Sequence, residues 1–123
     1  MMRNSLFVCT TAALLTLVGS SVSWADDTGF ITIHELRREG RLYCTSSHTH
    51  VGTGTVQRTK RRATRSAARE WSEFTTWEYG SDWGRWRNAR GKTVSCTGRR
   101  GAITCTVEAR PCKVLRKRRR RRR

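Results

Sequence analysis

The sequence predicts a small α+β domain stapled by disulfides. Three observations support this class: a helical period of apolar residues over residues 60–79, alternating apolar and polar residues over 92–109, and four cysteines after the N-terminal segment. A chain of 123 residues has room for one small domain, expected over residues 26–115. Five cysteines, one proline and a hydrophobic fraction of 36% fit neither a collagen-like nor a fully disordered chain, because aromatic residues and a set of cysteines that can pair are both present.

The first 25 residues are typical of a secretory signal. One arginine precedes an apolar run over residues 6–18, and Ser23 and Ala25 supply the small side chains of a cleavage site. The run is short for a membrane span. We therefore expect cleavage after Ala25 and a periplasmic or secreted protein, with an uncleaved N-terminal anchor as the alternative.

Loss of the signal removes Cys9 and leaves an even number of cysteines. An exported chain favours two disulfides among Cys44, Cys96, Cys105 and Cys112. Four cysteines allow three pairings. We prefer Cys96 with Cys105, which the expected hairpin register places opposite each other, and Cys44 with Cys112; the other two pairings stay open.

Two short strands are expected before the helix. Residues 28–36 are rich in β-branched side chains, Arg38-Glu39-Gly40 favours a turn, and residues 41–45 form the second strand. Residues 46–59 contain two glycines among serines and threonines without a sustained period, so we expect a loop there.

The clearest periodic pattern predicts a long amphipathic helix over residues 60–79. Arginines lie on its polar face. Its apolar stripe comprises Ala63, Ala67, Trp71 and Phe74, with Trp77 at the edge.

Gly80 is expected to end the long helix, and Ser81 to cap a short second helix over residues 82–90. Residues 92–109 then predict a C-terminal β-hairpin that turns near Arg100-Gly101, with Pro111 ending its second strand.

The four tryptophans of residues 71–86 are expected to build the core, with Trp77 and Trp86 partly exposed. A stacking platform for sugars or bases is the alternative.

The residue order W…YG..W..W..A from Trp71 to Ala89, followed by C…C and by A-x-P-C ending at Cys112, resembles a group of small exported proteins of rhizobia and related alphaproteobacteria. The resemblance covers about residues 63–112. It implies a bacterial periplasmic or secreted location, and it implies no activity.

The basic residues concentrate in two segments of a chain whose formal net charge is +17. Six lie within residues 58–69, which contain no acid, and residues 116–123 form an unbroken basic tail that self-repulsion is expected to keep disordered. Guanidinium groups bind phosphate through paired hydrogen bonds. The expected polyanion-binding residues are Arg61, Arg62, Arg65, Arg69, Arg116, Lys117, Arg118, Arg119, Arg120, Arg121, Arg122 and Arg123. A solvated helix face and a tail without a selected role are the alternatives.

No catalytic motif is present: the sequence lacks G-x-S-x-G, a P-loop and H-E-x-x-H. The clustered acids Glu70, Glu73, Glu78 and Asp82 are expected to form ion pairs on the helix surface. We therefore expect a non-enzyme without a cofactor.

Cys44, His48 and His50 suggest zinc ligands. However, there is no C-x-x-C knuckle, and an oxidising compartment favours disulfides. We therefore expect no metal site and solvated loop histidines.

These features together favour a protein that associates electrostatically with anionic envelope components: lipopolysaccharide, anionic lipid or acidic polysaccharide. A protein-interaction module with a Trp-rich surface is one alternative, and a nucleic-acid-binding protein is another if the N-terminus does not direct export.

Overall fold

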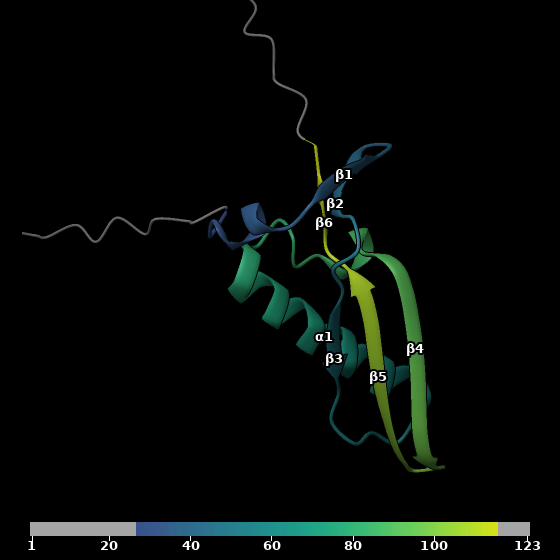
Figure 1. The fold of residues 1–123 in the computed structure, drawn as a ribbon. Helices are drawn as coiled ribbons and strands as arrows, with labels where there is room; N and C mark the ends of the chain where they lie inside the picture. The colour runs from purple at the N-terminus through teal and green to yellow at the C-terminus, as the bar shows by residue number, and fades with distance from the viewer. Residues whose placement is uncertain (1–26, 116–123) are drawn as a thin grey trace, which may run out of the picture.

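One α-helix and six β-strands in two small sheets form the fold of residues 27–115, which the computed structural model describes (Figure 1). The predicted α+β class is confirmed. The expected signal over residues 1–25 and the basic tail over residues 116–123 lie outside the described residues.

The described residues form three-stranded antiparallel sheets with the orders β1-β2-β6 and β3-β5-β4. In Figure 1 the first sheet lies at one end of the longer strands of the second. In chain order the elements are the 3₁₀ helix η1 (Phe30–Ile33), β1 (Leu36–Glu39), β2 (Leu42–Thr45), β3 (His50–Thr53), α1 (Lys60–Tyr79), the 3₁₀ helix η2 (Trp86–Asn88), β4 (Arg90–Arg99), β5 (Ala102–Arg110) and β6 (Cys112–Val114).

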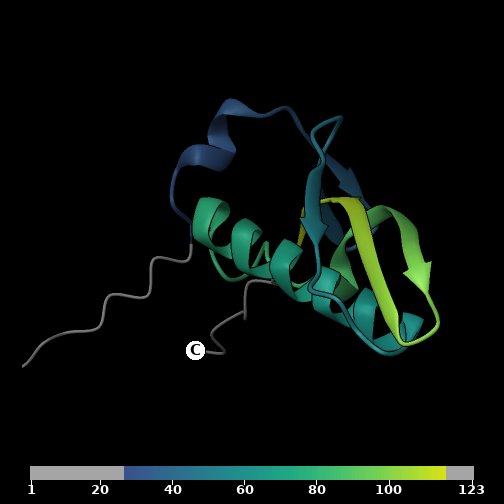
Figure 2. The same ribbon diagram turned by 90° about the horizontal axis from the view of Figure 1, so that it is seen from below.

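The helix α1 packs against β3 and β5 on one face of the second sheet (Figure 2). It has the predicted bounds. Thr59 caps its first turn by accepting a hydrogen bond from the backbone N–H of Arg62, and Gly80 ends it with a positive φ of 102°. The main core joins helix and sheet, and consists of Ala63, Ala67, Trp71, Ala89, Cys105, Val107 and Ala109.

The buried stripe of α1 differs from the predicted one in its second half. Phe74 and Trp77 are 44% and 77% exposed, whereas Thr75 and Tyr79 are fully buried. The cause is a change of partner, because the end of the helix packs on Ile31 of η1 and on the side chain of His50 in β3, instead of on the apolar residues of the main core. The expected exposure of Trp77 is confirmed.

The expected second helix over residues 82–90 is wrong. This segment forms a turn and then η2. Trp83 is buried and its indole N–H donates to Asp27 Oδ1 at 2.9 Å. The backbone at Gly84 lies so close to α1 that an added Cβ would overlap the Thr76 hydroxyl. These tertiary contacts override the local preference for helix.

The first expected strand, over residues 28–36, is also wrong, because its β-branched residues form η1 and the strand β1 begins only at Leu36. The 3₁₀ turn buries Ile31 and leaves Ile33 77% exposed. The second strand is confirmed as β2, and Gly40 adopts a positive φ of 62° in the turn between β1 and β2.

The expected loop over residues 46–59 contains a strand, β3, which pairs with β5 from His50↔Ala109 to Thr53↔Thr106. Its burial alternates, with His50 and Gly52 buried and Val51 and Thr53 exposed. The buried side of β3 faces α1. Its buried positions hold a histidine and a glycine instead of large apolar residues, so the sequence shows no alternation of apolar and polar side chains.

The C-terminal hairpin and both preferred disulfides are confirmed. The strands β4 and β5 turn at Arg100-Gly101, which places Cys96 opposite Cys105. Disulfides join Cys96 to Cys105 and Cys44 to Cys112. After Pro111 the chain leaves the second sheet, and β6 pairs with β2 of the first.

Candidate functional sites

Four exposed arginines lie along α1, and we call Arg61, Arg62, Arg65 and Arg69 the arginine face. Within residues 27–115 none of them makes a salt bridge with a carboxylate. The first turn of α1 contains no acid, although acids there would complement the helix dipole. The helix therefore concentrates positive charge where its own backbone is already partly positive.

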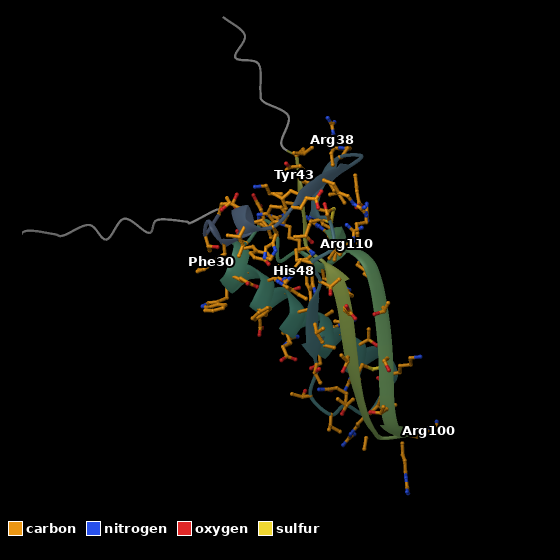
Figure 3. The ribbon with its side chains drawn as sticks, in the orientation of Figure 1. Phe30, Arg38, Tyr43, His48, Arg100 and Arg110 are labelled. Atoms are coloured by element: carbon orange, nitrogen blue, oxygen red, sulfur yellow. A yellow bond between two sulfur atoms is a disulfide. The ribbon has the colours of Figure 1, made fainter. Side chains whose placement is uncertain are left out.

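The arginine face belongs to an end of the molecule built from acid-free sequence. Residues 40–69 and 83–107 contain no Asp or Glu. They supply β3, the first half of α1, β4 and most of β5. Arg100 points away from the molecule at the tip of the hairpin (Figure 3). Arg61, Arg62 and Arg65 therefore have no acid within four residues in the sequence, whereas Arg69 is followed directly by Glu70.

Two shallow hollows flank the arginine face, and Arg65 lines both. One presents hydroxyl and amide groups beside the guanidinium groups, and is lined by Thr55, Gln57, Arg62, Arg65, Ser66 and Arg69. The other has an aromatic wall, and is lined by Lys60, Arg61, Thr64, Arg65, Ala68 and Trp86.

Trp86 is the aromatic wall of the second hollow. Its ring is half-buried, as expected, and packs edge-on against Trp71 with ring centroids 5.1 Å apart. The ammonium group of Lys92 lies 5.1 Å from its ring centroid. This arrangement places cations around an indole that is itself held in position by the core.

The structure brings the four predicted helix arginines onto one surface. The predicted tail residues, over 116–123, lie outside the described part of the chain. Sequence reasoning missed Thr55 and Gln57, because the segment before α1 was expected to be a plain loop, and it missed Ser66, which lies within α1 itself.

A second cluster gathers three histidines at the C-terminal end of α1. His34 follows η1, His48 precedes β3 and His50 lies in β3. The rings of His34 and His48 stack with centroids 4.2 Å apart, and those of His48 and His50 are edge-on at 5.0 Å. The expectation of solvated histidines is wrong for His50, which is 3% exposed.

The last turn of α1 completes this histidine cluster. Tyr79 shares a hydrogen bond of 2.7 Å between its hydroxyl and Nε2 of His34. Oε2 of Glu78 lies 2.9 Å from Nε2 of His50, but not in line for a hydrogen bond, and Nε2 has no hydrogen-bond partner within residues 27–115. On the other side of the ring, Nδ1 of His50 lies 2.8 Å from the hydroxyl of Thr75.

Burial controls the titration of the cluster. It lowers the pKa of His50 to about 4, helped by the neighbouring His48 and His34. Burial and His34 also lower the pKa of His48, against the opposing effect of Glu78. The pKa of Tyr79 is raised to about 12 by burial and by Glu78. At neutral pH the imidazole of His50 is therefore uncharged.

Cys44 does not join these histidines, because it is bonded to Cys112. The Cys/His zinc set considered from the sequence is therefore not formed. Among the clustered acids, Asp82 forms a surface pair with Arg85 at 3.1 Å, whereas Glu78 turns toward His50. No local signal could have linked Glu78 to a histidine 28 residues earlier in the chain.

No protein-family model, curated protein or solved structure matches this chain. Among the described residues no helix is both long and apolar enough to cross a membrane. The two disulfides are typical of an oxidising, extracytoplasmic environment.

Proposed function

We propose that this protein is a non-enzymatic component of the periplasm or extracellular space that associates with anionic envelope material. The ligands are the phosphates and carboxylates of lipopolysaccharide, anionic lipid or acidic polysaccharide. The observation that carries this proposal is the arginine face, whose exposed guanidinium groups have no carboxylate partner among the described residues. The signal-like residues 1–25 and the two disulfides support the location.

The mechanism is electrostatic. A guanidinium group donates two parallel hydrogen bonds to one phosphate or carboxylate, and each contact releases counterions from the polyanion. Binding is therefore strong at low ionic strength and falls steeply as salt rises. The hollow beside Ser66 offers hydroxyl groups to the same ligand, and the eight basic residues over 116–123 add charge on the same chain.

Vesicle binding tests the proposal. The double variant Arg62→Gln/Arg65→Gln is compared with the control Arg38→Gln/Arg41→Gln, which removes two exposed arginines from the other sheet and its turn. On phosphatidylglycerol vesicles we expect the arginine-face variant to bind at least about 10-fold more weakly at low salt, with a salt slope smaller by about two. The control should lose much less, because its two arginines lie outside the arginine face; since both variants have the same net charge, a difference between them reports the position of the charge.

Three outcomes would count against the proposal: no binding of the unchanged protein to anionic vesicles at low salt, equal losses in both double variants, or an unchanged salt slope after deletion of residues 116–123. Competition with lipopolysaccharide, with an acidic polysaccharide and with DNA then distinguishes the sources of anionic groups.

An exposed aromatic pair favours a second candidate, a protein-interaction module. Phe74 and Trp77 lie on α1 with ring centroids 6.1 Å apart and are 44% and 77% exposed. An exposed pair of this size is typical of contact surfaces. In that case a pull-down would survive high salt and be lost in Trp77→Ala, whereas Arg62→Gln/Arg65→Gln would leave it unchanged.

A further inference from the structure

In the histidine cluster, a buried imidazole nitrogen lies next to a carboxylate without a hydrogen bond between them: Nε2 of His50 is 2.9 Å from Oε2 of Glu78. Thr75 donates its single hydroxyl proton to the carbonyl oxygen of Trp71 at 2.7 Å. The contact between Thr75 and His50 therefore requires Nδ1 of His50 to be the donor. Nε2 is then the ring nitrogen left to bind a ligand, and it lies inside the cluster 2.9 Å from Oε2 of Glu78.

This contact leaves room for a ligand shared by the two groups. Nε2 of His50 is buried without a hydrogen bond from any described residue, and a carboxylate oxygen lies 2.9 Å from it. A metal ion bound to both atoms would satisfy the nitrogen and balance the charge of the carboxylate. The last turn of α1 also carries Glu78 and no basic residue at the negative end of the helix dipole.

Three ligand atoms converge at this point. One atom each from His48, His50 and Glu78 lie within 4.8 Å of one another. In a tetrahedral zinc site, bonds of about 2.1 Å place ligand atoms about 3.4 Å apart. His48 and Glu78 are only partly buried, so small rotations of these two side chains close the remaining distance.

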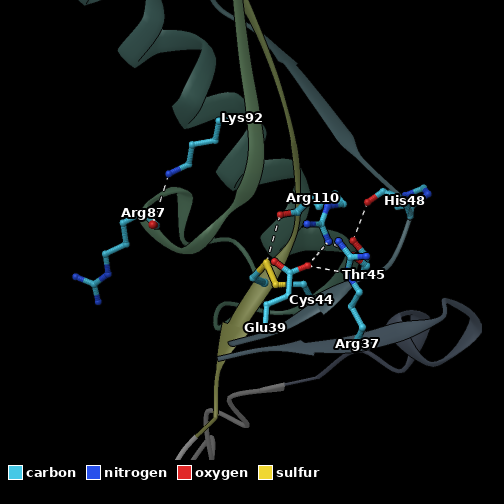
Figure 4. The surroundings of a disulfide bond; sticks show 9 residues. Arg37, Glu39, Cys44, Thr45, His48, Arg87, Lys92 and Arg110 are labelled. Carbon is cyan, nitrogen blue, oxygen red and sulfur yellow. Dashed lines mark hydrogen bonds and ion pairs between the residues drawn. A yellow bond between two sulfur atoms is a disulfide. The ribbon is translucent and has the colours of Figure 1, made fainter. Parts of the chain in front are cut away.

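The surroundings hold two of the ligands in position. The hydrogen bond to Thr75 fixes the ring orientation and tautomer of His50, which is the usual arrangement for a metal-binding histidine. The hydroxyl of Thr45, which is buried, donates to the backbone carbonyl of His48 at 2.7 Å and fixes the loop before β3 (Figure 4).

We propose that His48, His50 and Glu78 bind one divalent transition-metal ion of the zinc class, with a fourth coordination position left open. Two imidazoles and one carboxylate suit Zn²⁺, and the cysteines take no part because their thiols are joined in disulfides. This site is independent of the arginine face and of its proposed polyanion ligands.

Metal titration tests the site. The full chain, with disulfides intact and any free thiol alkylated without reductant, is titrated with Co²⁺ as an absorbing probe and then with Zn²⁺ as competitor. We expect one Co²⁺ per chain with visible absorption that Zn²⁺ abolishes. Glu78→Gln and His48→Gln should each weaken Zn²⁺ binding at least about 100-fold, because each removes a direct ligand. Glu73→Gln, on the same helix and with the same charge change, should leave binding unchanged.

A third variant distinguishes the loss of a metal ligand from a loss of folding. His50→Asn keeps an N–H donor near the position of Nδ1 and removes Nε2, so it should bind no metal while retaining the circular dichroism of the unchanged protein. If His50→Asn does not fold, Glu78→Gln and His48→Gln decide the question.

The proposal is wrong if the unchanged protein binds no stoichiometric Zn²⁺ at micromolar concentration, or if Glu78→Gln and His48→Gln bind Zn²⁺ as tightly as Glu73→Gln. Arg62→Gln/Arg65→Gln should retain the metal, whatever the vesicle result.

Discussion

Arg110 joins the two sheets through its guanidinium group. It lies at the end of β5, and its Nη1 donates to the backbone carbonyl of Thr45 at 2.7 Å and lies 2.8 Å from Oε1 of Glu39 (Figure 4). Arg37 approaches the same carboxylate oxygen at 2.7 Å. The hydrogen bond from Arg110 is the main reason that the pKa of Glu39 lies below its ordinary value, followed by the contact with Arg37, while burial acts in the opposite direction.

Glu39→Gln should lower the free energy of unfolding by about 1 kcal/mol at pH 7. A fully buried ion pair would contribute more, but Glu39 is partly exposed and water screens its charge. Since the folded pKa of Glu39 is the lower one, the unfolded chain takes up its proton first as pH falls. The contribution of Glu39 is thus present above the unfolded pKa and is lost as pH falls through the folded one. Urea unfolding at pH 7 and pH 3 should show the difference between the two proteins shrinking at pH 3. A constant difference would contradict the prediction, and Glu35→Gln, at an exposed site, is the control.

At the scale of elements, β3 shows why a glycine-containing segment can be a strand. An ideal Cβ on Gly52 would lie 2.5 Å from the backbone nitrogen of Trp71, and one on Gly54 would lie 2.5 Å from that of Ala67. The two glycines fall on the same side of the extended chain, which lets the backbones of β3 and α1 approach closely. Glycines suggest a loop when only the sequence is considered. Here the packing of β3 against α1 requires glycine at both positions, because a larger side chain would not fit.

Gly52→Ala should therefore destabilise the protein by about 3 kcal/mol, because backbone atoms of α1 block the added methyl group and cannot rotate away. Val51→Thr, at the exposed neighbouring position, should change stability by less than about 1 kcal/mol. Thermal unfolding of both variants checks this, and a Gly52→Ala protein as stable as the control would mean that β3 and α1 are not in close contact.

Elements with a strong local signal were predictable. The period of α1, the two-residue turn of the hairpin and the resulting position of Cys96 opposite Cys105 are all encoded within short segments. The segment around Ile31 was not predictable, because contact with Tyr79 and Trp83 selects its conformation. The candidate sites differ in the same way: one helix carries the arginine face, whereas the histidine cluster needs α1 and two further chain segments, residue 34 and residues 48–50.

At the scale of the whole molecule, the two disulfides close loops of very different size. Cys44 and Cys112 are 68 residues apart, and Cys96 and Cys105 are 9 apart. If the main effect is on the entropy of the unfolded chain, Cys44→Ala/Cys112→Ala should cost about 4 kcal/mol and Cys96→Ala/Cys105→Ala about 3 kcal/mol. Unfolding without reductant measures both, and the reverse order would show that local packing outweighs loop size.

The two disulfides also determine which fragments stay covalently linked after proteolytic cleavage of the chain. The exposed Arg99-Arg100 pair at the hairpin tip, a natural target for proteases that cleave after basic residues, lies inside the ring that the Cys96–Cys105 bond closes. That ring lies inside the larger one closed by Cys44–Cys112, which also encloses the whole of α1. A single nick at the tip therefore releases no fragment: both pieces remain covalently one molecule, with the arginine face still attached.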